Sequence, residues 1–220
     1  MKKIQNFVCP VSKLLIVGVM IVVLHLLIGF YYAGNQFLEN MATAVPRTAA
    51  GGEGGPQYML PGDHFEQLYR YSLPRHNLER GRPLYESGYQ YNLTAGAPAY
   101  REGWVFFPFS LLHAALSFFV GDVTPYNLIA LLSFALVGGA MYWLVFSLTR
   151  SYAAALLSSL LLALLPHRTS FLFGEMVYGV DLMWPPLIVL AFEKAIRTLQ
   201  ARYAAVFGVV LFFYVTSNVQ

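Results

Sequence analysis

The chain has 220 residues, of which 57% are hydrophobic and only 11% are charged. Its apolar stretches approach the roughly 20 residues that cross a bilayer as a helix, so the composition predicts an all-α integral membrane protein and excludes an ordinary soluble domain. The formal net charge of +3 at pH 7 bears on membrane orientation and gives no indication of nucleic acid, and the single cysteine excludes an internal disulfide.

The first apolar stretch, residues 14–32, follows Lys2, Lys3 and Lys13. Basic flanks stay in the cytoplasm under the positive-inside rule, so residues 1–33 are expected to form a cytoplasmic flank and a first transmembrane helix. A cleaved signal peptide is the competing interpretation, although an apolar core of about 19 residues is long for one. The hydrophilic residues that follow are then expected outside the cytoplasm.

A hydrophilic loop, residues 34–103, carries 13 of the 25 charged side chains. Its sequence predicts short amphipathic helices on the membrane surface, and we assign it to an extracytoplasmic region that extends over 34–124. The chain is therefore expected to be a polytopic helical protein with a large first outer loop.

Asp63 opens a helical pattern in this loop, which Pro74 is expected to end. The apolar face of the helix is expected to consist of side chains at helical spacing: Phe65, Leu68, Tyr69 and Ser72 or Leu73. On the other face Asp63, Glu66 and Arg70 stand about one turn apart. A carboxylate there can take a proton from a hydroxyl or hold a metal that bridges to phosphate, and an arginine can bind phosphate. The structural alternative is a helix cap at Asp63 and a surface ion pair between Glu66 and Arg70.

A second short helix, starting at Arg75, is expected to close at Gly81 and to lead into an aromatic loop that ends at Tyr100 and Arg101. Tyrosine and tryptophan concentrate at the headgroup level, so this loop is expected to lie against the outer leaflet. The alternative is that its rings stack on a sugar while an arginine holds a lipid phosphate.

Five further apolar stretches follow: residues 104–120, 125–148, 152–165, 179–192 and 203–215. If residues 104–120 crossed the membrane, Arg150 and the basic segment 194–202 would both lie outside, against the positive-inside rule. We therefore expect 104–120 to lie along the interface or to re-enter, and 125–220 to form the transmembrane region.

This orientation brings Glu175 and Asp181 to the same side of the membrane as Asp63. Asp181 is expected either near the site or, as the simpler interpretation, as a solvated residue at a helix end. His167 and Arg168 are expected at a helix exit, where contact with headgroups is the ordinary role.

Several short stretches carry a resemblance to a known family: Pro61-Gly62-Asp63-His64-Phe65-Glu66-Gln67-Leu68-Tyr69-Arg70, Gly81-Arg82-Pro83-Leu84-Tyr85 and Trp184-Pro185-Pro186-Leu187. With the basic N-terminus, the single span, the long outer loop and the closely spaced later spans, they resemble the GT-C superfamily of polytopic glycosyltransferases over nearly the whole chain. The resemblance implies an inverting transfer of a sugar from a polyprenyl-phosphate donor to a glycan, lipid or protein on the outer face of a bacterial or archaeal plasma membrane.

Roles for individual residues follow from this resemblance. Asp63 maps to the general base or metal ligand, so a divalent cation, Mg²⁺ or Mn²⁺, is one candidate cofactor. Glu66 departs from the tight Asp-x-Asp spacing of some members, and Glu175 is a candidate second acid. The candidates for binding the donor are Arg70, Arg75, Tyr100 and Arg101.

The alternative function is a non-catalytic membrane subunit or a transporter or flippase component of a cell-envelope pathway. A transporter would usually show broken helices with polar residues inside several spans, whereas the spans after Pro125 have only Gly138 and Gly139 as a close-packing pair. His25, inside the first span, is interpreted as bonded within the bundle, with a proton-relay group as the alternative. Because members of the family carry more spans, the chain is expected to be an N-terminal fragment.

Overall fold

The computed structural model describes residues 2–43, 45, 64–87, 100–101, 104, 106–174 and 177–217 of the chain, and helices dominate this part. Its only β structure is a pair of two-residue antiparallel strands, β1 (Glu86–Ser87) and β2 (Tyr100–Arg101). The prediction of an all-α fold is confirmed.

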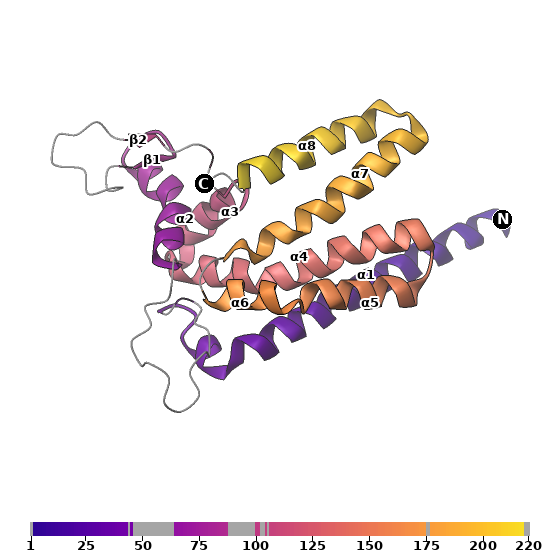
Figure 1. The fold of residues 1–220 in the computed structure, drawn as a ribbon, viewed down its shortest axis with the longest axis horizontal. Coiled ribbons are helices and arrows are strands. Elements are labelled where there is room, and N and C mark those ends of the chain that lie inside the picture. Colours follow the sequence, from indigo (N-terminus) through magenta and orange to yellow (C-terminus); the bar gives the residue numbers. More distant parts are fainter. Residues whose placement is uncertain are drawn as a thin grey trace.

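Five helices lie roughly side by side in a bundle (Figure 1): α1 (Lys2–Glu39), α4 (Val123–Thr149), α5 (Tyr152–Ala163), α7 (Trp184–Thr198) and α8 (Ala201–Ser217). The central one is α4, which contacts α1, α5 and α7. Between α5 and α7, the short helix α6 (Pro166–Gly174) and the 3₁₀ helix η2 (Val177–Met183) bring the chain back toward the start of α4.

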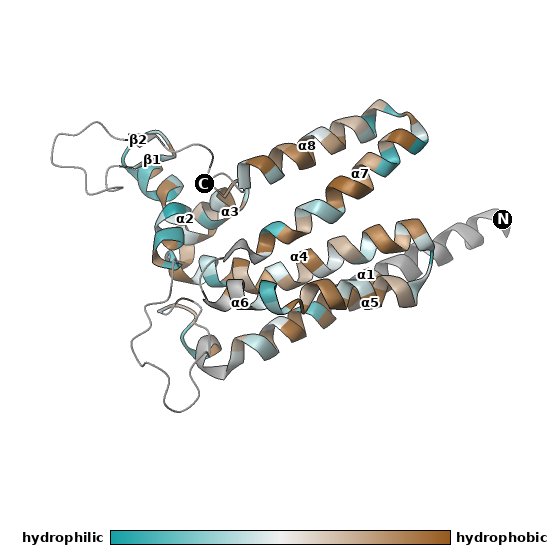
Figure 2. Ribbon diagram, in the orientation of Figure 1, coloured by the Kyte–Doolittle hydropathy of each residue, from teal (hydrophilic) through white to brown (hydrophobic). Residues whose placement is uncertain are grey.

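One end of the bundle is covered by α2 (His64–Glu79) and α3 (Phe109–Val120), which pack against each other and against α4 (Figure 1). The end of α8 reaches the same place, whereas the N-terminus, the α4–α5 turn and the α7–α8 turn lie at the other end. Figure 2 shows α2 as mostly hydrophilic beside the apolar helices of the bundle. The end of the bundle that α2 covers therefore carries a hydrophilic helix.

Two helices are long and apolar enough to cross a membrane, Ile16–Gly34 within α1 and Val123–Thr149, which is α4. The helices α3, α5 and α8 are apolar but shorter. The stretch of α1 exposes large apolar side chains, among them Met20, Leu27 and Tyr31. Such a surface needs lipid or a partner to cover it.

Close packing joins α1 to α4. His25 is fully buried, and its Nδ1 donates a hydrogen bond of 2.7 Å to the carbonyl of Ile21. Gly138 of α4 makes room for this ring, because a Cβ there would lie 2.1 Å from Cδ2 of His25, whereas a Cβ at Gly139 would meet nothing within 4 Å. The interpretation of His25 as bonded within the bundle is confirmed.

Pro74 does not end α2, contrary to the sequence prediction, and the two expected short helices are one. A proline inside a helix costs about 3 kcal/mol because it removes a backbone hydrogen bond and clashes with the preceding turn. Side chains beyond it anchor the last turns and offset this cost: Asn77 Nδ2, for example, donates to the carbonyls of Leu84 and Glu86. The expected end at Gly81 holds, where φ is +64°.

The expected apolar face of α2 is only partly right, since Leu73 is buried and Leu68 packs against the core. Phe65 is 59% exposed, while His64, Gln67, Tyr71 and Asn77 are buried. Buried polar groups are usually hydrogen-bonded. His64 and Gln67 find a partner in Tyr126 of α4, and Asn77 finds partners in the carbonyls of Leu84 and Glu86. This pairing across elements is invisible to helical periodicity.

Candidate functional site

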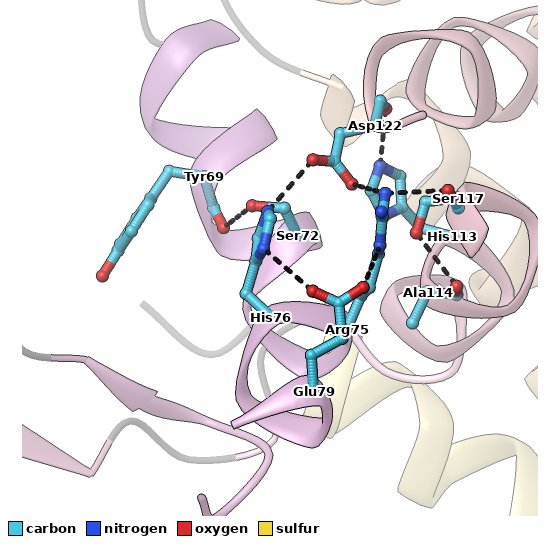
Figure 3. Close-up of polar contacts among 9 residues, drawn as sticks. All are labelled: Tyr69, Ser72, Arg75, His76, Glu79, His113, Ala114, Ser117 and Asp122. Carbon is cyan, nitrogen blue, oxygen red and sulfur yellow. Dashed lines mark hydrogen bonds and ion pairs between the residues drawn. The ribbon is translucent and has the colours of Figure 1, made fainter. Parts of the chain in front are cut away.

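A polar network joins the second half of α2 to the turn between α3 and α4 (Figure 3). Arg75 Nη1 donates to the carbonyl of Ser117 at 2.8 Å and to Asp122 Oδ1 at 3.2 Å, while Nε donates to Glu79 Oε1 at 3.0 Å. His76 Nε2 lies 3.1 Å from Asp122 Oδ2. The guanidinium thus binds a carbonyl at the end of α3, which also accepts from the Gly121 N–H, and two carboxylates. These contacts favour a structural role for Arg75.

His113 completes this junction from α3. It is fully buried, and its Nε2 donates a hydrogen bond of 2.8 Å to the carbonyl of Asp122. Burial lowers the pKa of the ring, against the raising effect of Asp122. A neutral His113 therefore supports the α3–α4 turn.

The first turns of α2 make a second contact, with the start of α4. His64 Nδ1 lies 2.8 Å from the hydroxyl of Tyr126, and that hydroxyl donates a longer bond of 3.4 Å to Gln67 Oε1. All three side chains are buried. The residue that follows Asp63 in the sequence is therefore fixed against the bundle.

A third polar group lies at the same end of the bundle, around Asp181 of η2. The side chain is buried, and neither carboxylate oxygen has a hydrogen-bond partner in the described part of the chain. The hydroxyl of Tyr71 from α2 and Nε1 of Trp184 from α7 are likewise buried and unpaired there. Ser217 of α8 also lies nearby, so four elements meet at this carboxylate.

Burial raises the pKa of Asp181 to about 7, although Ser217 and Trp184 partly favour the charged form. Burial also raises the pKa of Tyr71 well above its ordinary value, and the charge of Asp181 raises it further. Asp181 is thus poised to exchange a proton near neutral pH, while Tyr71 stays protonated and able to donate. The expectation that Asp181 is a solvated residue at a helix end is wrong, because η2 holds it inside the bundle.

Arg168 of α6 is a second buried charge where the sequence predicted a headgroup contact, and that expectation is wrong too. It is 1% exposed. Its Nη atoms donate to the carbonyl of Ala163 and to Ser133 Oγ, and the guanidinium lies 4.2 Å from the ring centroid of Phe134. Among the described residues no acidic side chain pairs with it.

The predicted site residues are only partly brought together. Asp63 and Glu175 lie outside the described residues, so their predicted roles stay predictions. For Tyr100 and Arg101 the structure describes the backbone in β2, opposite Ser87 and Glu86, and not the side chains.

Glu66 and Arg70 form the surface ion pair that was weighed as the structural alternative. Arg70 Nη2 lies 2.6 Å from Glu66 Oε1, and the Glu66 side chain is 55% exposed. Such pairs contribute about 0.3 to 0.5 kcal/mol. The pair leaves the predicted roles of both residues untested.

Sequence reasoning missed the cluster of Tyr71, Asp181 and Trp184. One signal was present, since an acid inside the apolar stretch 179–192 is costly in a membrane protein and marks a functional candidate. The partners of Asp181 come from α2 and α8, which no local pattern connects to η2.

Metal binding finds no support in the geometry of the described residues, which contain no group of three or more His, Cys, Asp or Glu side chains able to hold an ion. Asp63, the predicted ligand, lies outside these residues, so a Mg²⁺ or Mn²⁺ site stays a prediction.

Comparisons with protein-family models, with curated proteins and with solved structures found no match to this chain.

Proposed function

We propose that the protein is a membrane glycosyltransferase that moves a sugar from a polyprenyl-phosphate donor to an acceptor glycan, lipid or protein outside the cytoplasm. The observation that carries the proposal is the polar end of the bundle, where the long hydrophilic connection between α1 and α3 sends α2 across the start of α4. The resemblance of the stretches around Asp63 and Gly81 to the GT-C superfamily supplies the chemistry.

Charge supports the proposed orientation. Arg150 in the α4–α5 turn, and Lys194, Arg197 and Arg202 around the α7–α8 turn, share the end of the bundle where α1 begins (Figure 1). Basic residues favour the cytoplasmic side, so the opposite end, with α2, α3 and Asp181, faces outward in this proposal. Lipid-linked donors present their sugar at that surface.

Asp63 acts as the general base in the proposed reaction. The acceptor hydroxyl attacks the anomeric carbon of the donor as Asp63 takes its proton. The bond from that carbon to the phosphate oxygen breaks, its electron pair leaves with the polyprenyl phosphate, and the anomeric configuration inverts. Arg75 is held by Asp122 and Glu79, and Arg70 pairs with Glu66. Arg101 is therefore the better candidate for the donor phosphate.

The test is sugar transfer by the complete gene product in membranes, with a set of radiolabelled polyprenyl-phosphate sugars. Asp63→Asn should lower transfer by about a hundredfold or more, the range for loss of a general base. Glu193→Gln is the matched control, because Glu193 pairs with Arg197 at the other end of the bundle. Transfer that survives Asp63→Asn would contradict the proposed role of Asp63. A correctly folded protein that consumes no donor would point to a non-catalytic subunit or a transporter component.

A further inference from the structure

The carboxylate of Asp181 lies among buried polar groups. Within 3.5 Å its two oxygens, the Tyr71 hydroxyl and Trp184 Nε1 form no hydrogen bond in the parts of the chain that the structure describes, although Trp184 and Ser217 lie close enough to Asp181 to stabilise its charged form. The exposed fractions of these side chains are 7%, 1% and 4%. An unpaired buried polar group costs about 1 to 3 kcal/mol, so a cluster of them indicates something that binds there.

The four polar groups at this place, from Asp181, Trp184, Tyr71 and Ser217, restrict the chemistry of that ligand. A carboxylate only accepts hydrogen bonds when ionised, an indole N–H only donates, and tyrosine and serine hydroxyls do both. A cation would suit Asp181 but would meet the positive end of the Trp184 N–H dipole, and an anion would be repelled by the carboxylate. A hydroxyl group satisfies both sides at once, since it donates to Asp181 and accepts from Trp184 or Tyr71.

Aromatic rings line the same place. Tyr71 stacks on Phe106 with ring centroids 4.8 Å apart, and Trp184 contacts Phe109 and Phe213 at 6.0 and 5.6 Å. These rings belong to the buried core and close the site with apolar surface, while Tyr71 and Trp184 each carry a polar group beside the carboxylate. A ligand that carries several hydroxyls on a compact carbon ring matches both features.

We propose that Asp181, Tyr71 and Trp184 form a binding site for the hydroxyl groups of a saccharide, at the junction of α2, η2, α7 and α8. Asp181 accepts from one hydroxyl, and the Trp184 N–H and the Tyr71 hydroxyl donate to another. The choice of a saccharide among hydroxyl-bearing ligands rests on the proposed sugar transfer, in which this site holds the acceptor or donor sugar. Asp63 and the resemblance to glycosyltransferases play no part in the geometry of the site.

The test uses Trp184 as its own reporter. Of the three tryptophans in these 220 residues, Trp104 and Trp143 are both more than half exposed. A protein with Trp104→Phe, Trp143→Phe and phenylalanine at every tryptophan beyond these residues leaves the emission of Trp184 alone. The complete gene product is placed in phospholipid nanodiscs rather than in a sugar-headed detergent. It is titrated with glucose, mannose, galactose and N-acetylglucosamine, and separately with Mg²⁺ and ammonium ions.

We expect a saturable change in the emission of Trp184 with at least one sugar. Asp181→Asn and Tyr71→Phe should weaken the apparent affinity about tenfold or more, as expected for loss of a hydrogen bond to a charged or buried group. The matched controls are Glu193→Gln and Tyr152→Phe, since Tyr152 is 53% exposed at the far end of the bundle, and both should bind as the parent does. Stabilisation of the parent against heat by the same sugar gives a second readout that does not depend on fluorescence.

The inference is overturned if no sugar gives a saturable response in the folded protein, if the Asp181 and Tyr71 variants bind as the controls do, or if only the cations bind. It is separable from the proposed function. Transfer that depends on Asp63 without any sugar response at Trp184 would remove this site alone. A sugar response without transfer would remove the glycosyltransferase proposal and leave a saccharide-binding membrane protein.

Discussion

Replacing Asp181 by asparagine should remove a pH dependence from the stability of the bundle. Burial raises the pKa of this carboxyl from its ordinary value of 3.8 to about 7. Between these two values the folded chain binds more protons than the unfolded chain, so the free energy of unfolding falls as the pH rises and is constant again above pH 7. The shift of about three pH units, at about 1.4 kcal/mol each, corresponds to about 4 kcal/mol.

The asparagine side chain cannot ionise, so the variant and the parent should have similar stability near pH 4 and differ by about 4 kcal/mol above pH 7, with the variant more stable. For a chain of this size that difference corresponds to a melting temperature higher by about 8 to 16 °C. The assay is the loss of helical circular dichroism on heating, from pH 4 to 9, in one membrane mimetic. Histidines titrate in both proteins and cancel in the difference.

The groups that act on Asp181 are Tyr71, Trp184 and Ser217, and none of them ionises in this pH range. Glu66→Gln is the control, because that carboxylate is more than half exposed and its removal should leave the pH profile parallel to the parent. Parallel curves for Asp181→Asn and the parent would refute the reasoning, since they would mean that the carboxyl titrates alike in the folded and unfolded chains.

Three other substitutions test the packing by the same stability assay. Gly138→Ala should cost about 1 to 3 kcal/mol, because its Cβ would lie 2.1 Å from the His25 ring of α1. Gly139→Ala, whose Cβ would meet nothing within 4 Å, should be neutral or slightly stabilising. Equal effects of the two substitutions would contradict the close approach of α1 and α4. Arg75→Ala should cost about 1 to 3 kcal/mol because it removes the hydrogen bonds of the guanidinium to the Ser117 carbonyl and to two carboxylates. Arg70→Ala, which loses a surface ion pair, should cost less than about 0.5 kcal/mol, and a reversed order would remove the structural role of Arg75. Arg168→Met should be neutral or stabilising, because it removes a buried charge. Arg168→Lys should be destabilising, because a lysine cannot reproduce the two hydrogen bonds and the stacking of the guanidinium. A destabilised Met variant would indicate an anionic partner for Arg168.

Composition predicted the helical class correctly, because the distribution of apolar residues along the chain is a local property. The helix end at Gly81 was likewise readable, since this glycine adopts a positive φ that other residues disfavour. Pro74 was misread for the opposite reason. Whether a proline ends a helix depends on what holds the next turns, and Arg75 and Asn77 find their partners in other elements.

The candidate site was less readable than the fold. Periodicity assigned Phe65 to the buried face of α2 and ignored His64 and Gln67, because it weighs hydrophobicity and cannot see that Tyr126 of α4 offers them a partner. Asp181 stood out only as an acid in an apolar stretch. Its neighbours Tyr71 and Ser217 are 110 and 36 positions away, so their meeting is a consequence of the tertiary fold.

The most direct measurement is the fate of a polyprenyl-phosphate sugar incubated with the purified complete gene product in nanodiscs, followed by mass spectrometry of the lipid. The account predicts release of polyprenyl phosphate that requires an acceptor hydroxyl, is lost in Asp63→Asn and is kept in Glu193→Gln. A donor that stays intact with the folded parent protein, for every sugar and acceptor class supplied, would contradict it.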